Sequence, residues 1–147
     1  GKDDAGNFLG ISAGLVQGAD VTAAGGTLRV AAVSDINGRY GTVDYAPRVE
    51  AAVERATELD VEVFLIAGDM IAGQRPSPLL RREELEAMWA GFHATVTAPL
   101  AARGIPVLVT PGNHDASRQA SFGLERTIYA EQWAQRRRQH RQAKQSN

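Results

Sequence analysis

The sequence predicts an α/β fold built around a parallel β-α-β-α-β core. Three short apolar runs, at residues 28–33, 61–67 and 105–109, are bounded by turn-forming residues and indicate buried strands. Two amphipathic segments separate these runs, and strands that alternate with helices usually pair in parallel through right-handed crossovers. With 147 residues, the chain is long enough for one domain with a real hydrophobic core.

The first crossover segment begins at Pro47, a residue that is well tolerated in the first turn of a helix. Its apolar residues recur every three or four positions, which predicts that one face of the helix packs on the sheet. These residues are Val49, Ala52, Val53, Ala56 and Leu59.

For the second crossover, we expect Ser77 to be the N-cap and Pro78 the first residue of a helix. Pro99 should kink or end this helix, and Gly104 should stop whatever remains of it. The apolar face of the helix comprises Leu85, Met88, Trp89, Phe92 and Val96.

Outside the core, we expect residues 1–27 to form an irregular arm with one short strand near residues 11–16. Residues 28–135 form the α/β domain, and its last helix runs from Leu124 to Gln135. Residues 136–147 are basic and polar, and are predicted to be a solvated tail or an extension of that helix. A nucleic-acid-binding role for the tail is less favoured, because no aromatic residues alternate with its arginines.

The composition excludes several classes of protein. There is no cysteine, so disulfides and thiolate metal sites are excluded. No apolar run is long enough to span a bilayer, and the net charge of −1 argues for no general affinity for nucleic acid or membranes. The chain begins with Gly1 rather than Met, which fits either a cytoplasmic protein or an exported one whose signal has been removed.

Each predicted strand is followed directly by a polar cluster. The clusters are Ser34-Asp35-Ile36-Asn37-Gly38, Gly68-Asp69-Met70 and Gly112-Asn113-His114-Asp115. In parallel sheets all three would lie at the carboxyl edge, where ligands bind. Taken singly, each cluster is also a plausible turn. Three such clusters in a row favour a site for a hard metal and an oxygen-rich substrate, with a phosphate ester as the best candidate.

The third cluster is the most informative, because its three polar side chains have complementary chemistry. The amide oxygen of Asn113 can ligate a metal, and His114 can protonate a leaving oxygen. The carboxylate of Asp115 can orient the imidazole or stabilise its charge. We therefore expect His114 and Asp115 to be the catalytic pair.

These motifs, in this order and spacing, resemble the first three motifs of the calcineurin-like metallophosphoesterase superfamily. The resemblance implies a four-layered α/β/β/α sandwich, of which residues 28–135 would be a truncated N-terminal half. It also implies a dinuclear metal site and hydrolysis of a phosphomonoester or phosphodiester. Asp35 and Asn37 would bind the first metal, Asp69 would bridge both ions, and Asn113 would bind the second. His114 would act near the leaving oxygen, and the divalent ion would be Mn, Fe, Zn or Mg.

The sequence departs from this family pattern in two respects. Asn37 stands where the family usually has histidine, which implies either a looser first metal site or a preference for a harder ion such as Mg²⁺ or Mn²⁺. The only histidine after His114 is His140, whereas the family has further metal-binding histidines in its C-terminal half. A second hypothesis is therefore an inactive half-domain with weak metal or phosphate binding. Its exposed apolar sheet face would be covered by a partner such as the missing C-terminal half, by self-association or by the N-terminal arm.

Overall fold

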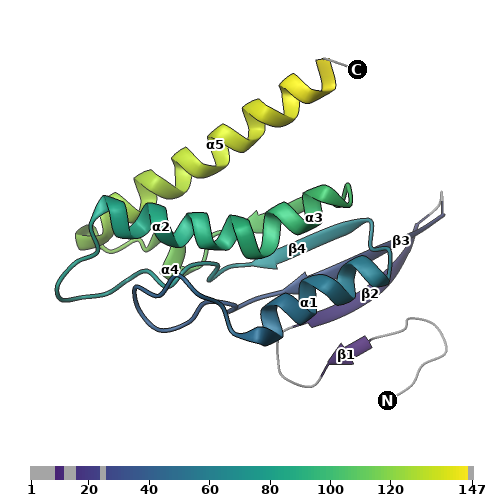
Figure 1. Ribbon diagram of the computed structural model, residues 1–147, viewed down its shortest axis with the longest axis horizontal. Helices are drawn as coiled ribbons and strands as arrows, with labels where there is room; N and C mark the ends of the chain where they lie inside the picture. Colours follow the sequence, from purple (N-terminus) through teal and green to yellow (C-terminus); the bar gives the residue numbers. More distant parts are fainter. Residues whose placement is uncertain (1–8, 12–15, 24–25, 146–147) are drawn as a thin grey trace.

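A computed structural model describes residues 9–11, 16–23 and 26–145 of the chain. The described residues form one five-stranded sheet in the order β1-β2-β3-β4-β5 (Figure 1). Strands β3, β4 and β5 are parallel, and β1 and β2 are antiparallel additions beyond β3. The bounds are β1 Leu9–Ile11, β2 Val16–Ala23, β3 Gly26–Val33, β4 Val63–Ala67 and β5 Val107–Thr110. The predicted α/β fold with a parallel core is confirmed.

The helices alternate with the parallel strands, as the sequence predicts. The bounds are α1 Pro47–Glu58, α2 Arg82–Phe92, the π-helix η1 His93–Thr97, α3 Ala98–Ala102, α4 Asn113–Ala116, the 3-10 helix η2 Ala120–Phe122 and α5 Gly123–Gln145. Helices α1, α2 and α3 lie on the same face of the sheet (Figure 1). Two right-handed crossovers that step in the same direction across neighbouring strands place their helices on one face.

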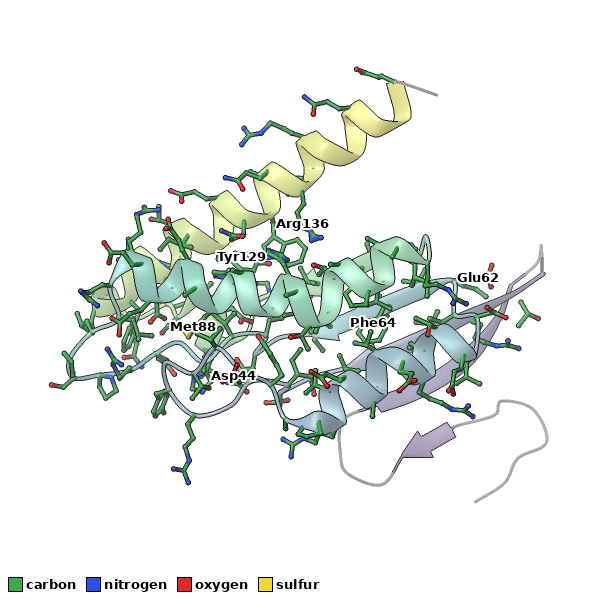
Figure 2. The ribbon with its side chains drawn as sticks, in the orientation of Figure 1. Asp44, Glu62, Phe64, Met88, Tyr129 and Arg136 are labelled. Atoms are coloured by element: carbon green, nitrogen blue, oxygen red, sulfur yellow. The ribbon has the colours of Figure 1, made fainter. Side chains whose placement is uncertain are left out.

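The hydrophobic core lies between this face of the sheet and the helices. Alternate residues of β3 and β4 are buried, as expected for strands with one covered face. Phe64 from β4 and Met88 from α2, both labelled in Figure 2, are each 1% exposed. The predicted apolar face of the second crossover is confirmed, since all five of its residues are buried: Leu85, Met88, Trp89, Phe92 and Val96.

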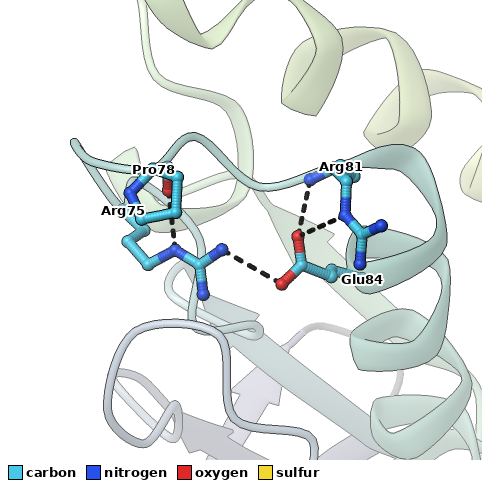
Figure 3. A network of polar contacts seen from close by, with 4 residues as sticks. All are labelled: Arg75, Pro78, Arg81 and Glu84. Atoms are coloured by element: carbon cyan, nitrogen blue, oxygen red, sulfur yellow. Dashed lines mark hydrogen bonds and ion pairs between the residues drawn. The ribbon is translucent and has the colours of Figure 1, made fainter.

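The start of α2 differs from the expectation for Ser77 and Pro78. The helix begins at Arg82, four residues after Pro78. Glu84 decides this start, because its carboxylate accepts the Arg81 backbone N–H at 2.9 Å and caps the first turn. The Arg75 guanidinium donates to the other carboxylate oxygen at 3.0 Å and to the Pro78 carbonyl at 2.8 Å (Figure 3). These bonds hold residues 75–81 as a loop.

The predicted irregularity at Pro99 is present and has an identifiable form. The turn His93–Thr97 is a π-helix, and the N–H of Ala98 donates to the carbonyl of His93. Pro99 then occupies the first turn of α3, where its missing N–H is harmless. The helix ends at Ala102, and Gly104 follows with a φ of +70°. The stop predicted at Gly104 is confirmed.

The first part of the chain is more regular than the sequence suggests. Residues 16–23, expected to belong to an irregular arm, form β2, and β3 already begins at Gly26. The short strand expected near residues 11–16 falls partly outside the described residues, and the described ends of that range belong to β1 and β2. The segment contains Gly18 and Asp20, which obscure the strand pattern. Pairing with the whole of β3 stabilises this segment as a strand, although its local sequence does not favour one.

Helix α5 extends the expected last helix through most of the basic segment, to Gln145. It packs against α2, with the rings of Tyr129 and Trp133 centred 5.9 and 6.2 Å from Trp89. Ile128 is fully buried in this contact, whereas Leu124, at the start of the helix, is 39% exposed. The packing places the first turns of α5 beside the loops that follow β4 and β5.

The opposite face of the sheet is apolar and open. Leu65 pairs in register with Ala32 on one side and Leu108 on the other. Leu108 is 56% exposed and Leu28 is 40% exposed. Within the described part of the chain, no helix is both long and apolar enough to cross a membrane.

Candidate active site

The three polar clusters follow β3, β4 and β5, so all three lie at the carboxyl edge of the parallel sheet. Backbone hydrogen bonds tie the first two loops together: the N–H of Asp35 donates to the Gly68 carbonyl, and the N–H of Asn37 donates to the Asp69 carbonyl, both at 3.2 Å. The third loop joins them through the N–H of His114, which donates to Asp69 Oδ1 at 3.0 Å. The expected juxtaposition of the clusters is present.

The two aspartates have an uncommon backbone conformation. Asp35 has a φ of +53° and Asp69 a φ of +55°, in the left-handed region. Aspartate is among the few residues other than glycine that adopt this region readily. The conformation turns the chain sharply just after each strand ends, and Asp35 remains exposed while Asp69 is half-buried. Both carboxylates are therefore displayed by turns rather than by regular structure.

Two glycines allow the loops after β4 and β5 to approach each other closely. A Cβ added at Gly68, whose φ is +92°, would lie 2.8 Å from the Cα of Gly112. A Cβ added at Gly112 would clash with the Asp69 backbone nitrogen and with Asp69 Oδ1. Only residues without a side chain fit at these two positions. The position of the Asp69 carboxylate therefore depends on Gly112.

The His114 ring is oriented by a backbone group. Its Nδ1 lies 2.8 Å from the carbonyl oxygen of Gly73. A carbonyl can only accept, so Nδ1 carries the proton in this contact. The half-buried ring also packs against exposed Tyr40, with ring centroids 5.4 Å apart at a tilt of 37°. Nε2, on the opposite edge of the ring, is the nitrogen that can exchange a proton with a substrate.

The Asp115 carboxylate is bonded to backbone groups rather than to the imidazole of His114. This carboxylate is fully buried and accepts three backbone hydrogen bonds: Oδ1 from the N–H groups of Met70 at 2.8 Å and Ile71 at 3.0 Å, and Oδ2 from Gly112 at 2.8 Å. Burial raises the pKa of this carboxyl, and the three hydrogen bonds oppose that rise. Asp115 thus joins the loops after β4 and β5.

The reason for this difference is helical geometry. His114 and Asp115 are neighbours in the single turn α4, and successive helical residues point about 100° apart. The two side chains of this turn therefore point in different directions. The expectation that Asp115 orients the imidazole of His114 is replaced by the bond between His114 and Gly73.

Several contributors to the site were not identified from the sequence. Gly73 and Tyr40 contact His114, as described above. Gln74 accepts a hydrogen bond from Asn113 Nδ2 at 2.8 Å, and its own backbone N–H donates to Glu125 Oε1 at 2.8 Å. Glycine, glutamine and glutamate in loops and helices carry no sequence signal for such roles. Only the fold brings residues 74, 113 and 125 together.

The four expected metal ligands are two carboxylates and two amides, from Asp35, Asn37, Asp69 and Asn113. All four lie at the carboxyl edge of the sheet, three of them in loops and Asn113 at the start of α4, and all offer hard oxygen donors of the kind that Mg²⁺ and Mn²⁺ accept. The chemistry of this set fits a hard divalent ion. Among the described residues, no group of three or more His, Cys, Asp or Glu side chains is arranged to hold a metal ion. A dinuclear centre is therefore not evident in the described part of the chain.

Comparison with known proteins agrees with the motif order. The family model for calcineurin-like phosphoesterases matches residues 28–144, which is well over half of the 147 residues. No curated protein and no solved structure matches the chain. The chain belongs to the calcineurin-like phosphoesterases, a family of metal-dependent phosphoesterases.

Proposed function

We propose that this chain hydrolyses a phosphomonoester or phosphodiester at the carboxyl edge of its sheet, with the help of a dinuclear metal centre. Asp35 and Asn37 would hold the first ion, Asn113 would hold the second, and Asp69 would serve both. The proposal rests chiefly on one contact, the hydrogen bond of 3.0 Å from the His114 N–H to Asp69 Oδ1. It joins the proposed bridging ligand to the proposed proton donor.

The chemistry follows from the donors and from the orientation of His114. Divalent ions would supply charge neutralisation at the phosphate and a nucleophilic hydroxide at neutral pH. When His114 is protonated, its Nδ1–H stays on the Gly73 carbonyl, and its Nε2–H is free to donate to the leaving oxygen. Among the ions Mn, Fe, Zn and Mg, the carboxylate and amide donors favour Mg²⁺ or Mn²⁺.

The test is hydrolysis of p-nitrophenyl phosphate and bis(p-nitrophenyl) phosphate by the full chain with Mn²⁺, Mg²⁺, Zn²⁺ or Fe²⁺. We expect Mn²⁺-stimulated turnover that is abolished in Asp69→Asn, because this change removes the bridging charge while keeping the size of the side chain. Asp44→Asn, at an exposed loop position, is the matched control and should retain full activity. Inertness with all four ions, or full activity of Asp69→Asn, would contradict the proposal.

A second candidate function is an inactive half-domain that acts through association. Two observations favour it: the lack of a cluster of three or more His, Cys, Asp or Glu ligands among the described residues, and the exposed Leu28 and Leu108 on the open sheet face. A second copy of the chain, or a further part of the phosphoesterase domain, would cover this face.

Calorimetric titration with Mn²⁺ separates the two candidates. Two tight sites that disappear in Asp69→Asn support the enzyme and refute the inactive half-domain. One weak site or none, together with a concentration-dependent sedimentation coefficient that Leu108→Arg abolishes, supports the second candidate. A monomer at all concentrations that turns over substrate would exclude it.

A further inference from the structure

Gln74 has a backbone conformation that its type does not favour. Its φ is +68°, in the left-handed region that few residues other than glycine, asparagine and aspartate adopt. The backbone N–H of Gln74 donates to Glu125 Oε1 at 2.8 Å. This bond crosses from the loop after β4 to the third residue of α5, far along the chain, and holds the loop in its strained shape.

Glu125 is buried at a substantial cost. The residue is only 3% exposed, and burial raises the pKa of its carboxyl above the usual range. Its Oε2 accepts no hydrogen bond from any described residue. The bond to the Gln74 N–H is therefore the main local compensation for burying this carboxylate. Burying the Glu125 carboxylate with this one hydrogen bond is unfavourable. Its presence is explained most simply if the protein requires the backbone conformation of Gln74.

The side chain of Gln74 connects two residues that follow β5. Its Nε2 donates to Ser117 Oγ at 3.1 Å, and its Oε1 accepts from Asn113 Nδ2 at 2.8 Å. Ser117 is 4% exposed, and its Oγ also accepts the backbone N–H of Gln119 at 3.2 Å. With one end anchored on a buried hydroxyl, the Gln74 amide presents its oxygen to Asn113.

The hydrogen bonds of the Gln74 side chain bear on the orientation of the Asn113 amide. Asn113 is exposed, and a free asparagine amide at the surface can present either its nitrogen or its oxygen to the site. Only the oxygen can ligate a cation. By accepting a hydrogen bond from Nδ2, Gln74 engages the nitrogen and leaves Oδ1 as the atom available to a metal ion.

We propose that Gln74, held in place by Glu125, is a positioning residue that orients Asn113 Oδ1 toward the metal site. This inference rests on the proposed function, because it takes Asn113 to be a metal ligand. It adds Gln74 and Glu125 as determinants of metal affinity. Both residues would act through Asn113 rather than as ligands themselves.

The test compares two substitutions of Gln74 in the full chain. Gln74→Met keeps the length of the side chain but cannot accept from Asn113, whereas Gln74→Glu keeps an acceptor at the same place. Calorimetry should show Mn²⁺ binding weakened about 2- to 10-fold in Gln74→Met, as expected for the loss of one hydrogen bond. Gln74→Glu should bind at least as tightly as the wild type. Gln135→Met, at an exposed position of α5, is the control and should not change affinity.

A second readout does not depend on metal. In the metal-free protein, the side-chain NH₂ signals of Asn113 in a ¹⁵N–¹H spectrum report the bond to Gln74. We expect them to move in Gln74→Met and to stay close to the wild-type positions in Gln74→Glu. If Gln74→Met does not fold, the Asn113 signals of Gln74→Glu decide: retention supports the inference, and their shift to the position of a free asparagine overturns it.

The outcomes separate this inference from the proposed function. Unchanged Mn²⁺ affinity in a folded Gln74→Met variant overturns the positioning role even if the enzyme is active. Equal weakening by Gln74→Met and Gln74→Glu also overturns it, because the acceptor would then be irrelevant. If the wild type binds no Mn²⁺ while the Asn113 signals still depend on Gln74, the proposed metal site fails, and the inferred role in metal binding fails with it.

Discussion

The Nδ1 atom of His114 lies 2.8 Å from the carbonyl oxygen of Gly73. This contact settles which edge of the imidazole is used by the protein and which remains for a substrate. Because Gly73 holds the imidazole, the carboxylate of the next residue, Asp115, is not needed for that contact. It accepts hydrogen bonds from backbone N–H groups. The orientation of the proposed proton donor is therefore built into the backbone of the loop after β4.

We predict that His114→Asn strongly lowers the turnover rate without disturbing the fold. The asparagine Nδ2–H can replace Nδ1–H as the donor to Gly73, but nothing replaces Nε2. The turnover rate should fall about 10²- to 10⁴-fold, the range for the loss of a general acid. The fall should be larger for phenyl phosphate than for p-nitrophenyl phosphate, because the poorer leaving group needs the proton more. Steady-state rates of both substrates test this, and equal losses would contradict a general acid role.

Asp115 is predicted to determine stability. In Asp115→Asn, one carboxylate oxygen becomes an NH₂ group that faces a backbone N–H donor in a buried site. The free energy of unfolding should fall by about 2–3 kcal/mol, the cost of leaving buried donors unsatisfied. Urea unfolding measures this change. Asp44→Asn, at an exposed position, should shift stability by no more than about 0.5 kcal/mol, and a similar effect of both substitutions would refute the structural role of Asp115.

Gly112→Ala should displace Asp69, because the added Cβ meets the backbone and the carboxylate of that residue. Overpacking of this kind costs about 1–3 kcal/mol, and Mn²⁺ affinity should fall together with stability. Gly123→Ala is the matched control, since its nearest neighbour would be Arg126 Nη2 at 3.5 Å, an ordinary contact. Unfolding and calorimetry on both variants test the prediction. It would be wrong if Gly112→Ala bound Mn²⁺ as the wild type does.

The fourth prediction concerns pH and His93, which lies away from the proposed site. His93 contacts Thr97 at 2.9 Å, Gln132 at 3.0 Å and the Arg136 guanidinium at 3.2 Å, and it packs against Trp89. Burial, and then the charge of Arg136, lower the pKa of His93 below its usual range. The unfolded chain therefore binds a proton at a higher pH than the folded chain does.

The sign of the effect follows from this difference. The contribution of His93 to stability is present above its unfolded pKa of about 6.5 and is lost as the pH falls through its lower folded pKa. Unfolding free energies measured between pH 7.5 and pH 5 should fall toward acid. The fall should be shallower in His93→Gln, which keeps a polar side chain but does not titrate. Parallel pH profiles for the two proteins would show that His93 does not contribute.

The features that the sequence predicted correctly depend on local patterns. Strands β3, β4 and β5 coincide broadly with short apolar runs, although only one face of the sheet is buried, and α1 and α2 carry apolar residues at helical spacing. The loops after β3, β4 and β5 meet because parallel strands end at the same edge. The expectations that failed are those for which a distant residue competes with the local signal. Ser77 and Pro78 do not start α2 because Glu84 caps Arg81, and residues 16–23 form a strand because β3 offers them an edge.

The sequence alone determined the fold class, the family resemblance and which polar residues lie at the carboxyl edge of the sheet. It did so because hydrophobic period and motif order are properties of neighbouring residues. The tertiary structure alone decided what those side chains bind. Asp115 faces the backbone, His114 faces Gly73, and the Asn113 amide donates to Gln74. Hydrogen bonds between residues some forty positions apart depend on how the loops pack, and no local pattern encodes that packing.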